Sequence, residues 1–186
     1  MITIFKNKLH RAAQLILLFF LLVQFAEPEI TGSVTAIADG DTFTLLTPAN
    51  KQIRVRLYGV DAPEKGQDFH NVSKQYLSDL IFKKKVVVKQ INKDRYKRVV
   101  GIVTVEGINV NEALLKKGLV WHYTQYDNNK EWAKLELKAR KEKKAIWSMP
   151  NPTPPWNYRK KKRTTRSTSY INSPLFLCTP EAVLTL

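Results

Sequence analysis

Residues 52–64 read QIRVRLYGVDAPE, and this stretch decides the expected fold. From Gln52 to Tyr58, aliphatic residues alternate with polar ones, and a period of two is typical of a β-strand with one buried face. The alternation places Arg54 and Arg56 on the face that does not join the core. One face of the predicted strand can therefore meet an anion or water.

Turn residues and apolar periods on either side of this stretch predict the remaining elements. Aliphatic and β-branched runs bounded by turn formers predict strands at Ser33–Leu46, interrupted by Asp39-Gly40, at Gln52–Val60, at Lys85–Ile91 and at Arg98–Val105. Apolar residues at helical spacing predict helices at Phe69–Phe82, between the capping residue Asn109 and the stop at Gly118, and at Lys130–Lys144. The chain is therefore expected to contain one α+β domain, mainly β, at residues 31–158.

The chain as a whole is strongly basic. It contains 31 Lys and Arg residues against 16 Asp and Glu residues, which gives a formal net charge of +15. Such a charge attracts polyanions such as nucleic acid or an anionic membrane, although excess lysine also simply solvates a surface. The single cysteine, Cys178, excludes an internal disulfide bond and a cysteine-based metal site. The composition thus suggests a partner but no reaction.

Both ends of the chain differ in character from the expected domain. Basic residues at positions 6–11 precede an uncharged, mostly apolar run at 12–26, so residues 1–26 are expected to be the signal peptide of a secreted or extracytoplasmic protein. The run is shorter than the roughly 20 residues of a bilayer span, and an uncleaved N-terminal membrane anchor is the alternative. Residues 159–186 begin with a basic run and then become apolar, and they are expected to form a disordered tail.

Two aspartates stand near expected strand ends. Asp41 follows Gly40 in a tight bend, and Asp61 precedes Ala62-Pro63. A hard divalent cation needs oxygen ligands held close together, and carboxylates at strand ends supply them. The pair therefore suggests a metal site, whereas the segment Asp39–Thr42 alone is more typical of a hairpin turn.

Arginine and a further carboxylate lie close to this pair in the sequence. Arg56, Asp61 and Glu64 fall within nine residues, a combination that suits phosphoryl hydrolysis. In that chemistry a metal polarises a phosphate oxygen, arginine neutralises developing charge, and a carboxylate positions or deprotonates water. Arg98, in the segment Asp94–Arg98, can bring a second guanidinium to the same phosphate. The alternatives are a surface ion pair between Arg56 and Glu64 and a merely basic turn before Arg98.

Four short segments combine these features in a fixed order: Asp39-Gly40-Asp41-Thr42, Arg56–Glu64, Asp94–Arg98 and Val110-Asn111-Glu112-Ala113-Leu114. Together they resemble the thermonuclease (staphylococcal nuclease-like) family in order and approximate spacing. The resemblance covers roughly Ser33 to Trp156, including Ile146-Trp147 near its end. The joint pattern is far more specific than any of its parts.

The resemblance implies a fold, a cofactor and a set of site residues. The expected fold is a five-stranded OB-fold barrel with three helices, and the expected cofactor is Ca²⁺. By position, Asp41 and Asp61 resemble the calcium carboxylates, and the carbonyl of Ala62 completes the protein ligands. The residues that resemble the catalytic trio are Arg56, Glu64 and Arg98. Tyr123 and Tyr126 fall where the family places tyrosines against the nucleotide. Packing of the two tyrosines on the barrel rim is an open alternative.

Two functions follow from these expectations. The first is a calcium-dependent nuclease that hydrolyses the phosphodiester bonds of DNA and RNA and prefers single strands. It is expected to act as a monomer without a stable protein partner, either secreted or tethered to a membrane by its N-terminal segment. The second is a catalytically silent OB-fold module that binds nucleic acid or protein. The paired aspartates and Glu64 favour the nuclease, because an acidic pocket is costly for a protein that only binds polyanions.

Overall fold

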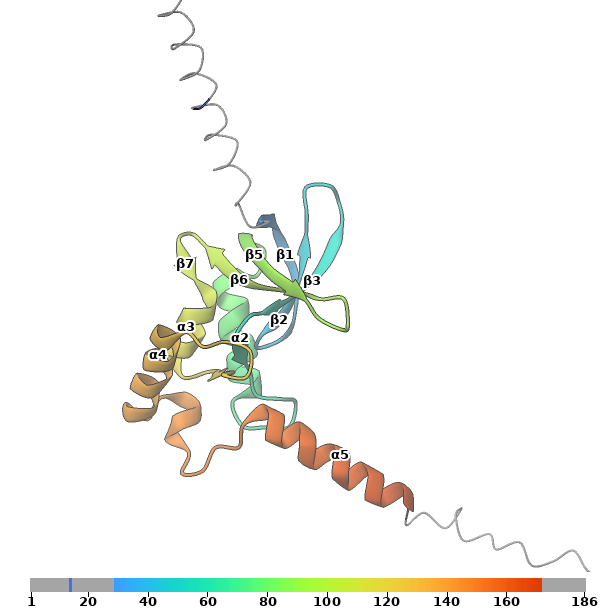
Figure 1. Cartoon of the computed structure of the whole chain (residues 1–186), viewed down its shortest axis with the longest axis vertical. Helices are drawn as coiled ribbons and strands as arrows, with labels where there is room; N and C mark the ends of the chain where they lie inside the picture. Colours follow the sequence, from blue (N-terminus) through green and yellow to red (C-terminus); the bar gives the residue numbers. More distant parts are fainter. Residues whose placement is uncertain (1–13, 15–28, 172–186) are drawn as a thin grey trace, which may run out of the picture.

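The computed structural model describes residue 14 and residues 29–171 (Figure 1). Apart from residue 14, the expected signal peptide or anchor at 1–26 lies outside the described residues, as does the tail from residue 172 onward. Among the described residues, no helix has the length and apolar character needed to cross a membrane.

Five strands close into a barrel. β1 (Glu29–Asp39), β2 (Thr42–Leu46) and β3 (Gln52–Leu57) are joined by antiparallel pairing, and β1 also pairs with β5 (Lys85–Lys93), which pairs with β6 (Val99–Val105). The parallel pairing of β3 with β6 closes the barrel. This mixed, closed arrangement confirms the expected five-stranded OB-fold barrel.

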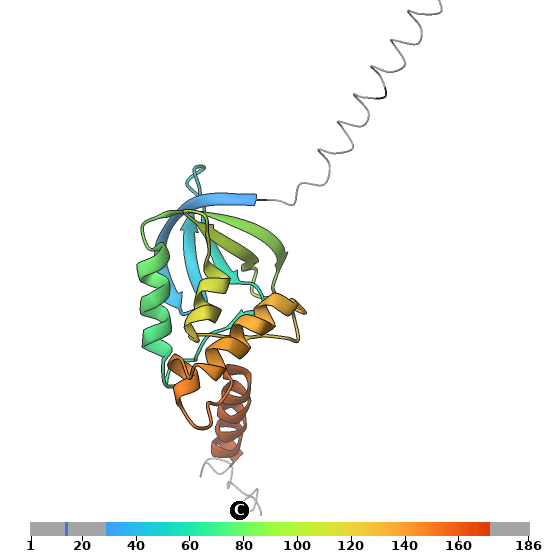
Figure 2. The same ribbon diagram turned by 90° about the vertical axis from the view of Figure 1, so that its left-hand side faces the viewer.

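Short strands and helices complete the domain. Two small additions are β7 (Ile108–Asn109), which pairs with β6, and β4 (Val60–Asp61), which pairs with β8 (Trp121–His122). The helices are α2 (His70–Ile81), α3 (Val110–Lys117), α4 (Lys130–Lys141) and α5 (Pro155–Ile171), and a short 3₁₀ turn, η1 (Ala145–Ser148), lies between the last two. Figure 2 shows α2 along one side of the barrel, with α3 and α4 below the strands.

The three expected helices form close to their predicted bounds, and two of them, α3 and α4, begin at a capping side chain. The side chain of Asn109 accepts a hydrogen bond from the backbone N–H of Glu112 (3.1 Å), as the capping pair predicted. Gly118 adopts a left-handed φ of 70° and closes α3 through its N–H. The side chain of Asn129 caps α4 in the same way as Asn109 caps α3.

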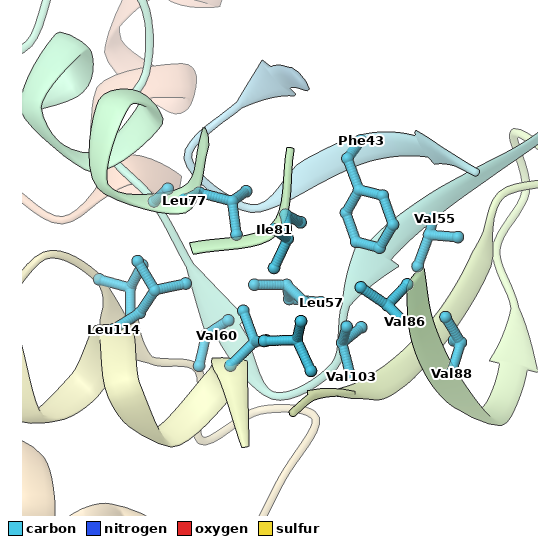
Figure 3. Close-up of a cluster of buried hydrophobic side chains, with 14 of the residues drawn as sticks. Phe43, Val55, Leu57, Val60, Leu77, Ile81, Val86, Val88, Val103 and Leu114 are labelled. Carbon is cyan, nitrogen blue, oxygen red and sulfur yellow. The ribbon is translucent and has the colours of Figure 1, made fainter. Parts of the chain in front are cut away.

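The core fixes the direction in which β3 presents its side chains. Aliphatic side chains from the barrel strands meet others from α2 and α3, and Phe43 lies among them (Figure 3). Val55 and Leu57 are fully buried there, and such side chains each stabilise the fold by about 1.5–3 kcal/mol. Because residues alternate along the strand, Arg56 is held on the opposite face.

The chain after residue 155 differs from the expectation. A disordered tail was expected from residue 159, but the structure is helical through Ile171, as the second part of α5. The described part of the chain therefore has four α-helices rather than three. Figures 1 and 2 show α5 projecting away from the barrel beyond its first turn.

Candidate active site

The bend after β1 places Asp41 against the segment that follows β4. Gly40 permits this close approach, since a Cβ there would lie 2.7 Å from the Cβ of Ser73 on α2 and 3.0 Å from that of Ala62. The backbone N–H of Ala62 donates to Oδ2 of Asp41 (2.9 Å), and the hydroxyl of Thr42 donates to Oδ1 (2.9 Å). The Asp41 carboxylate is consequently buried and fixed in orientation.

Asp61 reaches the same place through a turn that interrupts the expected strand. Gly59, with a φ of 65°, separates β3 from β4, so the single strand predicted at Gln52–Val60 is wrong at its end. A Cβ on Gly59 would also lie 2.8 Å from the ring of Trp132. After the turn, Asp61 pairs with Trp121 of β8 and is fully buried.

Arg56 joins the two aspartates. Its Nη1 donates to Oδ1 of Asp41 (2.9 Å) and its Nη2 donates to Oδ1 of Asp61 (2.7 Å). Burial disfavours the charged guanidinium, but the two carboxylates outweigh it and raise the pKa of Arg56. The surface ion pair with Glu64 that the sequence left open does not form, because the guanidinium faces inward to the aspartates.

A second guanidinium enters from α5. Nη2 of Arg159 donates to Oδ2 of Asp61 (2.8 Å), while its Nη1 donates to Oε1 of Glu64 (2.6 Å) and to Oδ1 of Asp61 (3.2 Å). Burial opposes ionisation of Arg159, yet the hydrogen bonds from its guanidinium to Asp61 and Glu64 raise its pKa. Arg159 thus completes a cluster of three carboxylates and two arginines.

Burial and charge act against each other at Asp61. Burial raises the pKa of Asp61 and the neighbouring Asp41 raises it further, whereas the hydrogen bond from Arg159 and the charges of both arginines lower it. The two arginines therefore partly offset the burial that disfavours the ionised form of Asp61.

Glu64 lies at the mouth of the cluster. Its side chain is 38% exposed, in contrast to the buried side chains of Asp41 and Asp61. Its backbone N–H donates to Oε1 of Gln67 (2.9 Å), and Nε2 of Gln67 donates to the carbonyl of Thr153 (2.8 Å). The loop that carries Glu64 is thus tied to the segment before α5, and the carboxylate remains open to water.

Arg98 stands on the same outward face as Arg56 but has a different partner. Val99 pairs with Val55 in the parallel β6–β3 pairing and both are buried, so the residue before Val99 points outward. Nε of Arg98 donates to Oδ2 of Asp94 (2.7 Å). Burial raises the pKa of Asp94, but the hydrogen bond from Arg98 outweighs burial, and the pKa is lowered. Within the described residues, the guanidinium of Arg98 has no ion pair with the three carboxylates of the cluster.

The two tyrosines after β8 lie together beside the cluster. The Tyr123 ring stacks on Trp156 of α5, with centroids 5.0 Å apart and planes inclined by 4°, and meets Tyr126 edge-on at 4.9 Å. Burial, and secondarily the charge of Asp61, raise the pKa of Tyr123, which places its phenol near the carboxylates. The Tyr126 side chain is exposed, so a ring remains accessible at this edge.

The donor set is compatible with a hard cation, which the resemblance implies. Asp41 and Asp61 offer only oxygen atoms, and their oxygens converge on one guanidinium, so they lie close enough to share an ion. The described residues contain no group of three or more His, Cys, Asp and Glu side chains suited to a metal. Any further ligands would therefore be backbone oxygens, such as the expected carbonyl of Ala62, and water.

Sequence reasoning missed the two residues that α5 supplies. Trp156 marked only the end of the resemblance, and Arg159 was assigned to a disordered tail. Arg159 is 98 residues from Asp61 in sequence, and nothing in a run of basic residues indicates which one turns back to a carboxylate. Because the two residues are so far apart in the sequence, no local pattern signals the pair.

Comparisons with known proteins agree with this geometry. A family model described as staphylococcal nuclease homologue matches residues 54–149. The chain is 36% identical to an uncharacterized endonuclease of Haemophilus influenzae over 160 aligned residues, and these cover 86% of this chain and 90% of that protein. It is 36% identical to an uncharacterized endonuclease of Escherichia coli, over 72% of this chain and 88% of that protein. It is 35% identical to a micrococcal nuclease of Shigella flexneri, over 71% of this chain and 82% of that protein.

Proposed function

The chain belongs to the staphylococcal nuclease homologue family and is a nuclease, and on this premise we propose that it is a calcium-dependent enzyme that hydrolyses the phosphodiester bonds of both DNA and RNA. The observation that carries the proposal is the convergence of Asp41, Asp61 and Arg56, with Glu64 open to water beside them. A family likeness alone would not distinguish an active from a silent domain.

Each residue of the cluster has a role that its position permits. Asp41 and Asp61 hold the cation, which when bound polarises a phosphate oxygen. Arg56 on β3 and Arg98, directly before the neighbouring strand β6, neutralise the charge that develops on the phosphate. Glu64 accepts a proton from the water whose oxygen forms the new bond to phosphorus, while the ester oxygen leaves. Tyr123 and Tyr126 provide aromatic surface beside the nucleotide.

The remaining parts of the proposal concern location and form. Export rests on the apolar run at residues 12–26, with a retained anchor as the alternative. The intact mass of the chain recovered from an exporting bacterium distinguishes removal of the segment from its retention.

A preference for single strands follows from the aromatic edge formed by Tyr123 and Tyr126, since an unpaired base exposes its face for stacking. The enzyme is proposed to act as a monomer.

Calcium should support hydrolysis much better than magnesium. Two carboxylates with backbone oxygens form an adaptable site that suits the larger ion, whereas magnesium demands near-octahedral geometry and retains its water. Release of acid-soluble nucleotides from single-stranded DNA and from RNA, with calcium, with magnesium and with a chelator, measures this. Equal rates with magnesium would contradict the assignment of the ion, and activity in the chelator would contradict the metal site as a whole.

Replacing Arg159 with alanine should tighten calcium binding by up to about fivefold, which corresponds to the roughly 1 kcal/mol of a partly exposed ion pair. Its guanidinium occupies both oxygens of Asp61, so calcium must displace it. Isothermal titration with calcium alone measures the affinity without any substrate. Arg163→Ala, one turn further along α5, removes the same charge from a side chain outside the cluster and serves as the control. Equal affinity in the Arg159→Ala variant and the unchanged protein would show that Arg159 does not compete.

A further inference from the structure

The helix α5 carries one sign of charge. Between Arg159 and Arg166 it contains six Lys and Arg residues and two threonines, and the whole of α5 has no Asp or Glu. Residues 160–163 are all exposed. Within the described residues, Arg159 forms ion pairs with the domain, whereas the side chains of Lys160, Lys161, Lys162 and Arg163 form none.

This distribution of charge is unfavourable for the helix by itself. Arg159 and Arg163 are four residues apart, and Lys160 and Arg163 are three apart, so like charges stand next to each other on the helix surface. No apolar stripe compensates, because residues 159–166 contain no apolar side chain. Figures 1 and 2 show this part of α5 projecting away from the barrel. A polyanion bound along the helix would remove the repulsion.

The first turn of α5 determines where such a polyanion would lie. Trp156 stacks on Tyr123, and Arg159 is paired with Asp61 and Glu64. Tyr158 lies against Gly66, where an added Cβ would come within 2.7 Å of its hydroxyl oxygen. The helix is therefore anchored at the catalytic cluster, and its exposed basic residues begin directly beyond it.

We propose that α5 is a nucleic-acid-binding arm, which holds the substrate strand next to the catalytic site through Lys160, Lys161, Lys162 and Arg163. The inference rests on the proposed function, because it takes the strand to be the substrate. The contacts are to backbone phosphates, so the arm binds without regard to base sequence. It makes the enzyme favour long strands over fragments that occupy the catalytic site alone.

The composition of the arm favours nucleic acid over a membrane surface. A helix that lies in a lipid interface needs an apolar face opposite its basic face. Residues 159–166 contain no apolar side chain that could supply one. The anchoring of the helix at a phosphodiesterase site also places its charges along the path of a strand rather than on a separate surface.

The test compares two variants with equal loss of charge. In the arm variant, Lys160, Lys161, Lys162 and Arg163 are all replaced by glutamine. In the control variant, four exposed lysines of α4 are replaced by glutamine: Lys130, Lys134, Lys138 and Lys141. All these side chains are exposed, so both variants should fold, and circular dichroism with thermal melts verifies this before binding is measured.

Binding is measured by fluorescence anisotropy in a chelator, so that no strand is cut. The ligands are a labelled single-stranded 30-mer and a labelled tetranucleotide, each over a range of salt concentrations. Each lost phosphate contact lowers the slope of log affinity against log salt by about 0.7, so the arm variant should lose about 3 for the 30-mer. Its affinity for the 30-mer relative to the tetranucleotide should fall by about tenfold or more at low salt. The control variant should keep most of both quantities.

Three outcomes would contradict the proposal that α5 binds nucleic acid. The first is an unchanged salt dependence of 30-mer affinity in the arm variant, and the second is an equal loss of 30-mer affinity in the control variant. The third is an arm variant that loses binding to phosphatidylserine vesicles but still binds the strand. These results are independent of the proposed function, because binding in a chelator needs no catalysis. If the unchanged protein fails to hydrolyse any nucleic acid with calcium, the proposed function fails, while the anisotropy data still decide on the arm.

Discussion

Replacing Arg56 with lysine is expected to lower the rate of phosphodiester hydrolysis by about 10²-fold or more, the scale seen when an electrostatic donor is removed from a transition state. The positive charge is conserved, so the reason is geometric. The two terminal nitrogens of Arg56 reach Asp41 and Asp61 at 2.9 and 2.7 Å at the same time. A lysine ammonium is a single compact point of charge and cannot reproduce this planar fork.

The same substitution should also affect stability. Arg56 lies between two buried carboxylates and donates to both, whereas a lysine ammonium in its place reaches only one of them and leaves the other without this partner. We therefore expect a lower Tm for Arg56→Lys in a chelator and a recovery of much of the loss in calcium, which would bind the carboxylate that has lost its partner. This effect on stability could not be predicted from the sequence, which places Arg56 on an outward face and does not show its buried partners.

Single-turnover rates and thermal melts with and without calcium measure both effects. Arg54→Lys, two residues earlier on the same outward face but exposed, is the matched control and should leave both quantities near their original values. Arg98→Lys belongs to the same experiment, and its rate should fall on a similar scale if Arg98 leaves Asp94 for the phosphate. Near-normal rates for both Arg56→Lys and Arg98→Lys would remove the two arginines from the catalytic mechanism.

Most of the barrel could be predicted from sequence because its signals are local. Alternation from Gln52 to Leu57 places Val55 inside and Arg56 outside, and the capping residues Asn109 and Gly118 set the ends of α3. The break at Gly59 was missed because the β-branched Val60 follows the glycine directly, so the run of strand-forming residues does not visibly end there. Only the packing against Trp132, which is distant in sequence, makes the turn at that glycine evident.

The helix α5 shows where such reasoning fails. A run of adjacent like charges without an apolar stripe is typical of disorder, and this pattern led to the expectation of a tail from residue 159. The anchor is a tertiary interaction, in which Arg159 pairs with Asp61 and Glu64 across 98 and 95 residues. Its geometry depends on the closed barrel and the loop after β4, so no local pattern could reveal it.

The site itself was partly predictable for the same reason. Asp41, Asp61, Arg56 and Glu64 were singled out from motif and spacing, and the structure brings all four into one cluster. Their pairing was not predictable. Glu64 is paired with Arg159 rather than Arg56, and its second oxygen, at the mouth of the site, has no partner among the described residues.

Replacing Glu64 with glutamine is expected to lower the single-turnover rate by about 10²- to 10⁴-fold, the range for loss of a general base. Glutamine has nearly the same shape, and its amide oxygen can still accept the hydrogen bond from Nη1 of Arg159, so the architecture should persist. What is lost is the ability to take a proton from water. The Tm should change little, because the ion pair with Arg159 is partly exposed and such pairs stabilise by about 1 kcal/mol at most.

A second carboxylate separates the loss of the base from the loss of a surface charge. Glu131 is also paired with a basic side chain, Lys134, but on the exposed surface of α4, and Glu131→Gln should leave the rate unchanged. Glu64→Asp keeps a carboxylate on a shorter stem, so it should retain more activity than Glu64→Gln if proton transfer is the role of Glu64. If Glu64→Gln instead hydrolyses single-stranded DNA at nearly the original rate, Glu64 only positions Arg159, and the water must lose its proton to another group.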